Sequence, residues 1–104
     1  MQRRLADGEP EAVFVRVQDR LQDMGVTPNL VDPVSITILF DMEIPGNGVS
    51  RFFLAVVPSG KGRSDVALAR RSNDKRKAMK AMVLSEDDPI EKKVLQDLLT
   101  PAAN

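Results

Sequence analysis

The chain has 104 residues, with 15 basic and 15 acidic side chains and therefore no formal net charge. It contains no cysteine, histidine, tryptophan or tyrosine, which excludes disulfides, zinc sites made of cysteine and histidine, and Ser–His or Cys–His nucleophiles within one chain. Its length is typical of one domain, and no apolar run approaches the roughly 20 residues of a membrane span. We therefore expect a single cytoplasmic domain over residues 1–104, with no catalytic site, cofactor or metal.

The first quarter of the chain predicts an arm followed by a helix. Residues 1–8 have no apolar periodicity, so we expect a flexible arm. A helix is predicted over residues 9–25, because Pro10 suits a first helical turn and Gly25 suits the end of a helix. One apolar stripe recurs at spacings of three and four residues: Val13, Val17, Leu21 and Met24.

Residues 34–58 have the pattern of a β-hairpin. Apolar residues occupy every second position of the first half, which is typical of a strand with one buried face. Gly46 and Asn47 tolerate the positive φ values of a tight turn. A loop centred on these two residues places Phe40 opposite Phe53.

The second face of this hairpin is also apolar, because the same register places Leu39 opposite Leu54. Such a hairpin needs cover on both sides, either from helices of the same chain or from a second copy. We therefore expect a homodimer in which the hairpins stack or pair edge to edge. The expected interface residues are Phe40, Phe53, Leu39 and Leu54.

The remainder of the chain predicts helices. A basic, amphipathic helical segment is expected over residues 64–84, with Ser72 to Asp74 as an alternative break. Asp88 and Pro89 predict the start of a C-terminal helix over residues 89–99. The predicted fold is therefore α+β: one N-terminal helix, one antiparallel β-hairpin and two or three C-terminal helices.

Two short patterns have a chemical as well as a structural interpretation. Asp41 and Glu43 lie on one face of the first hairpin strand, where two carboxylates could hold magnesium, but an exposed strand end explains them equally simply and is favoured. Residues 59–63, SGKGR, follow a predicted strand and precede a predicted helix, which is the context in which phosphate-binding loops occur. They lack the spacing of a nucleotide-binding P-loop, so an ordinary glycine-rich connection is favoured.

The basic segment 61–80 is the strongest functional signal. It carries eight basic residues against Asp65 and Asp74, so the rest of the chain is acidic. These side chains either neutralise nucleic-acid phosphates or form a solvated or protein-facing helix surface. The candidate contacts to phosphate or an acidic partner are Arg63, Arg70, Arg76, Lys77 and Lys80. We expect a small interaction protein, regulatory or part of an assembly, with nucleic-acid binding as the alternative.

Overall fold

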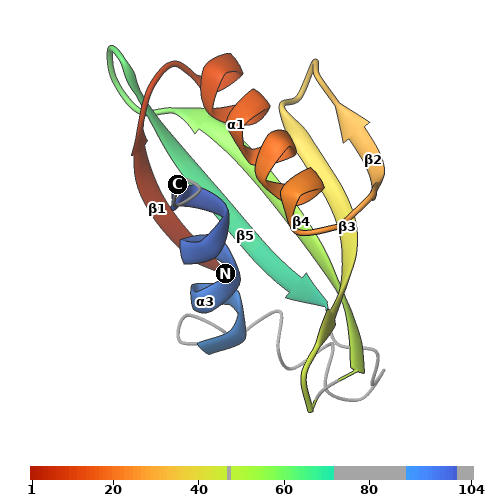
Figure 1. Cartoon of the computed structure of the whole chain (residues 1–104). Helices are drawn as coiled ribbons and strands as arrows, with labels where there is room; N and C mark the ends of the chain where they lie inside the picture. The colour runs from red at the N-terminus through yellow and green to blue at the C-terminus, as the bar shows by residue number, and fades with distance from the viewer. Residues whose placement is uncertain (47, 72–88, 101–104) are drawn as a thin grey trace.

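The computed structural model describes residues 1–46, 48–71 and 89–100, with the Arg71 side chain left out. These residues form five strands and two helices (Figure 1). In chain order the elements are β1 (Gln2–Asp7), α1 (Pro10–Asp23), β2 (Pro28–Asp32), β3 (Thr37–Ile44), β4 (Gly48–Pro58), β5 (Arg63–Arg71) and α3 (Pro89–Leu99).

All five strands belong to one antiparallel sheet with the order β1-β5-β4-β3-β2. Helix α1 carries the chain from β1 at one edge to β2 at the other edge. Both helices lie on the same side of the sheet (Figure 1). Side chains between the helices and the sheet form one core, and those with no more than 2% exposure are Val13, Val17, Leu21, Ile38, Phe40, Phe52, Leu54, Val56, Val66 and Leu68.

The predicted fold class is wrong, because the sheet has five strands and not two, and the described part of the chain is mostly strand. The expected flexible arm over residues 1–8 is also wrong. Its residues Gln2–Asp7 form β1, which pairs with β5 from Gln2↔Leu68 to Asp7↔Arg63. Edge pairing is made by backbone groups, so it needs no apolar periodicity in the sequence.

The expected basic helix over residues 64–84 fails in its first part, where Arg63–Arg71 form β5. Ser64, Val66 and Leu68 are buried and alternate with partly exposed residues, which is the period of a strand. The segment was ambiguous because Val66 and Leu68 fit both a strand and a helix pattern. The remaining residues, 72–84, and the alternative break at Ser72 to Asp74 lie outside the described residues.

The other predicted elements are confirmed. Helix α1 buries the predicted stripe at Val13, Val17 and Leu21. Helix α3 has the predicted bounds, 89–99, and buries its apolar side. Strands β3 and β4 form the predicted antiparallel hairpin.

The register of the hairpin differs from the prediction by one residue. Ile44 pairs with Gly48, so the connection is one residue shorter than the four-residue loop that was expected. Gly46 and Gly48 have φ values of +82° and +72°, which glycine adopts readily. Phe40 therefore faces Phe52, and the two rings stack under the helices with centroids 5.2 Å apart.

Candidate interaction surface

The sheet face opposite the helices carries a continuous row of apolar side chains, here called the apolar row. Direct cross-strand partners place Leu30 beside Leu39, Leu39 beside Phe53, and Phe53 beside Ala69. Leu30 is 58% exposed and Phe53 is 48% exposed. Within residues 1–46, 48–71 and 89–100, both helices lie on the other side of the sheet.

Further small and branched side chains extend the apolar row toward the β4–β5 loop. Ala55 and Ala67 are cross-strand partners in the next row. Beyond them Val57 on β4 and Leu5 on β1 are each about half exposed, at 51% and 54%, and Asp65 of β5 lies between them as the cross-strand partner of both. Together with the apolar row, the four residues Ala55, Ala67, Val57 and Leu5 define the open face. Exposed apolar patches commonly mark a site of protein association.

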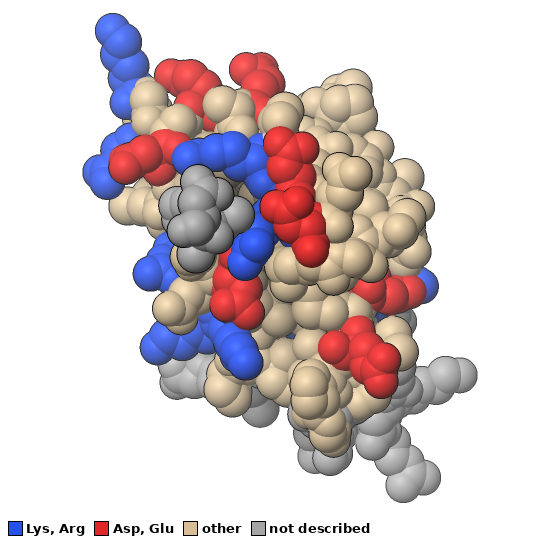
Figure 2. Space-filling view, in the orientation of Figure 1, with Lys and Arg blue, Asp and Glu red and all other residues tan. Residues whose placement is uncertain are grey.

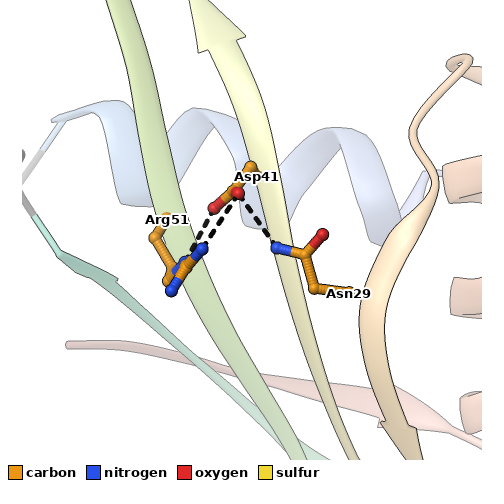
Figure 3. Close-up of polar contacts among 3 residues, drawn as sticks. All are labelled: Asn29, Asp41 and Arg51. Carbon is orange, nitrogen blue, oxygen red and sulfur yellow. Dashed lines mark hydrogen bonds and ion pairs between the residues drawn. The ribbon is translucent and has the colours of Figure 1, made fainter.

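A polar cluster of Asn29, Asp41 and Arg51 borders the apolar row on the side nearer the β3–β4 turn (Figure 3). Arg51 is the cross-strand partner of Asp41 and donates two hydrogen bonds to its carboxylate, from Nε to Oδ1 at 2.9 Å and from Nη2 to Oδ2 at 3.2 Å. Asn29 donates a third, from Nδ2 to Oδ2 at 2.9 Å. The hydrogen bonds from Arg51 and then from Asn29 lower the pKa of Asp41 below its ordinary value. Asp41 is therefore held as a carboxylate in a fixed position.

This cluster bears on the magnesium interpretation of Asp41 and Glu43. Both oxygens of the Asp41 carboxylate accept hydrogen bonds from Arg51 or Asn29. In the described part of the chain, no three acidic, histidine or cysteine side chains come together as metal ligands would. These contacts favour the interpretation of Asp41 as part of a charged border of the sheet face, and they do not favour a metal site.

The SGKGR segment joins two strands and so does not precede a helix. Ser59 N–H donates to the Arg63 carbonyl at 3.0 Å, which closes the β4–β5 hairpin. Gly62 N–H donates to Glu9 Oε1 at 2.9 Å, so a carboxylate of the chain already occupies the place where an anion would bind. The segment therefore acts as a connection between two strands, and Glu9 at the start of α1 contacts it. Because β5 and not a helix follows the segment, the interpretation as a phosphate-binding loop loses its structural basis.

The two described members of the predicted basic site are separated. Arg63 alternates with the buried residues of β5 and so lies on the sheet face opposite the helices. Its Nε lies 3.7 Å from Asp7 Oδ1. Arg70 lies at the other end of β5, in the alternate series that faces the helices, and donates to the Ser50 hydroxyl at 3.4 Å. Arg76, Lys77 and Lys80 lie outside the described residues.

A groove of about 600 Å³ lies between α1, α3 and β1 on the helix side. Its floor includes the buried Val13, Val17 and Leu98. Its charged lining consists of Arg4, Arg16, Arg20, Asp7, Asp19 and Asp23. Figure 2 shows that acidic and basic side chains are interleaved on this side of the molecule. The lining therefore carries three positive and three negative side chains and no net formal charge.

One carboxylate is fully buried on the helix side. Glu91, in the first turn of α3, has a side chain that is 1% exposed, and its Oε2 lies 3.2 Å from the Met1 ammonium nitrogen. Burial of a charge needs such an opposite charge nearby. This ion pair links α3 to the start of β1, and sequence reasoning missed it because β1 was not predicted.

The four predicted interface residues are divided between the two sides of the sheet. Leu39 and Phe53 lie side by side on the open face, as cross-strand partners. Phe40 and Leu54 are fully buried under the helices. Sequence reasoning missed the other members of the open face, Leu30, Ala69, Leu5, Val57, Ala55 and Ala67, because the flanking strands were not predicted and the register of β4 was shifted.

Comparison of the chain with models of known protein families and with curated proteins finds no match. In the ranges that the structure describes, no helix is long and apolar enough to cross a membrane.

Proposed function

We propose that the protein is a small non-catalytic interaction protein, regulatory or part of an assembly, that acts as a homodimer through its open face. The observation that carries the proposal is the apolar row, with Phe53 near its centre. Removing these side chains from water is the main favourable contribution to association.

The size of the open face suits a second copy of the chain. Neighbouring strands lie about 4.8 Å apart and residues of one face repeat about every 7 Å along a strand. The eight residues of the open face then cover roughly 270 Å² in projection, and protruding side chains raise the accessible area. A typical stable interface covers about 800 Å² of accessible surface per partner, so the open face supplies the apolar centre of such an interface and polar residues of the same sheet face would surround it.

The test is the oligomeric state, measured by analytical ultracentrifugation with wild type and Phe53→Asp. We expect wild type to be a dimer and Phe53→Asp to be a monomer, because the change places a charge in the centre of the contact. Val15→Asp is the matched control, since Val15 is 54% exposed on α1, on the other side of the molecule. It is expected to remain a dimer.

Folding of each variant is checked by far-ultraviolet circular dichroism, and Phe53→Ser serves if Phe53→Asp does not fold. Wild type that stays monomeric at all accessible concentrations would overturn the proposal. A dimer that survives both substitutions at Phe53 would also overturn it, because association would then use another surface.

Nucleic-acid binding through the segment 61–80 is the competing proposal. The separation of Arg63 from Arg70 gives it no support from the described residues. Because the chain has no tryptophan or tyrosine, bound nucleic acid would dominate its absorbance near 260 nm. A 260 nm peak that disappears after a high-salt wash would favour this alternative.

A further inference from the structure

We propose a specific geometry for the homodimer: its two-fold axis runs along the strands, in the plane between the two stacked sheets, over the space between β3 and β4. This inference rests on the proposed function. It places Phe53 against Leu39 of the partner subunit and Leu30 against Ala69 of the partner subunit. It also places Arg51 against Asp41 of the partner subunit.

The position of the axis follows from the length of the apolar row. The row has one member on each of four consecutive strands, β5, β4, β3 and β2, so its midpoint lies between β4 and β3. Rotation about an axis there exchanges β4 with β3 and β5 with β2, and so places the whole row on itself. An axis shifted sideways by one strand would leave one end of the row exposed to water.

Under this two-fold rotation, side chains of different size meet at the ends of the apolar row. At each end of the row the small Ala69 meets the larger Leu30 of the partner subunit. Sheets packed face to face interdigitate their side chains across about 10 Å. A large side chain opposite a small one fills that space without collision, which favours this arrangement for the ends of the row.

The charged border is also complementary to itself under this axis. Arg51 and Asp41 lie on β4 and β3 as direct partners, so exchange of the two strands makes each Arg51 face Asp41 of the partner subunit. The four charges then alternate in sign. An axis over β4 would instead place Arg51 against Arg51 of the partner subunit, so two like charges would meet.

An axis across the strands fits less well. If it passed through the apolar row, it would exchange the rows on either side. Arg51 would then lie against Ala55 of the partner subunit, so a charge would be desolvated against an apolar side chain. The axis along the strands also sets one charge, Asp32 of β2, against an apolar side chain, Ala67 of the partner subunit. Of the two axes, however, it is the one that pairs Arg51 with Asp41 of the partner subunit and Leu30 with Ala69 of the partner subunit, and these pairings select it.

Cross-linking tests the geometry directly, because the chain has no natural cysteine. Residues 69 and 30 lie three strands apart within one chain, which is about 14 Å across the sheet. We use Ala69→Cys and Leu30→Cys, separately and as an equimolar mixture, with a thiol cross-linker that reaches about 10 Å, the separation of stacked sheets. A cross-linked dimer is expected in the mixture and not in either variant alone.

A charge exchange gives an independent measurement in the same assay of association. Asp41→Arg and Arg51→Asp each give a homodimer with four like charges, and each is expected to lose dimer. Their equimolar mixture restores the alternating signs, so the dimer is expected to return as a heterodimer. The restoration should weaken as salt is added.

The outcomes separate the geometry from the proposed function. A wild-type dimer whose mixture of Ala69→Cys and Leu30→Cys does not cross-link overturns this axis and leaves the homodimer in place. Cross-linking of Ala69→Cys with Leu39→Cys in preference to Leu30→Cys would place the axis over β4. A monomeric wild type would remove both proposals.

Discussion

Two adjacent phenylalanines on β4 allow a direct test of the hairpin register. Phe52 is fully buried and stacks on Phe40, whereas Phe53 is 48% exposed on the open face. We expect Phe52→Ala to destabilise the protein far more than Phe53→Ala. The register expected from sequence alone would instead place Phe53 on the same face as Phe40.

The magnitudes follow from burial. Truncation of a fully buried phenylalanine to alanine costs about 3–5 kcal/mol, because a cavity remains. Loss of the stacked ring pair is part of that cost. Phe53 buries about half of its area against neighbouring strands, and water fills the space after truncation. At about 25 cal/mol per Å² the cost of Phe53→Ala is about 1–2 kcal/mol. The two variants should therefore differ by roughly 2 kcal/mol or more in the free energy of unfolding.

Urea unfolding followed by far-ultraviolet circular dichroism measures both values. The measurement is repeated at several protein concentrations, because any contribution of dimerisation to stability depends on concentration. Phe52→Leu replaces Phe52→Ala if the alanine variant does not fold, since it removes fewer atoms. Equal costs for the two positions, or a larger cost at Phe53, would refute the register and with it the assignment of Phe53 to the open face.

Two further predictions concern polar contacts. The pKa of Asp41 is lowered in the folded protein by Arg51 and Asn29, so the folded state binds fewer protons than the unfolded chain near the ordinary aspartate pKa of about 3.9. The stabilisation is present above that pH and is lost as the pH falls through the lowered pKa. Asp41→Asn should therefore flatten the loss of unfolding free energy on acidification below about pH 5, and an unchanged acid profile would contradict this. Glu9→Ala removes the acceptor for Gly62 N–H and should cost about 1 kcal/mol more than Glu11→Ala, which removes a carboxylate from the same helix start. Faster hydrogen exchange of the Gly62 amide in Glu9→Ala would confirm the contact, and equal costs for both variants would argue against it.

The helices and the hairpin could be predicted from sequence because each has a local pattern. Val13, Val17 and Leu21 repeat at the helical period, and Pro89 marks the start of α3. The outer strands have no such pattern. β1 contains one large apolar residue, Leu5. The strand is held in place by pairing with β5, more than fifty residues away along the chain. A strand that is held by pairing with a distant segment cannot be recognised from the periodicity of its own residues.

The candidate surface could be predicted only in part for the same reason. The apolar character of Leu39 indicated a second apolar face of the hairpin, and Leu39 lies on the sheet face opposite the two described helices. Its partner was misidentified as Leu54, because a loop one residue shorter moves every side chain of β4 to the other face. Leu30 and Ala69 could not be included before β2 and β5 were known.

The pairing of β1 with β5 has a consequence for how the protein is made. During synthesis the first strand leaves the ribosome well before β5, the strand with which it pairs, since Gln2 pairs with Leu68. At about 5–20 residues per second, β1 waits several seconds while the β3–β4 hairpin, whose contacts are local, forms without it. The addition of β5 and β1 to the sheet is therefore expected to be a late step in folding. Until then the free edge of β4 is open to other chains, so a slow or truncated synthesis should favour mispairing.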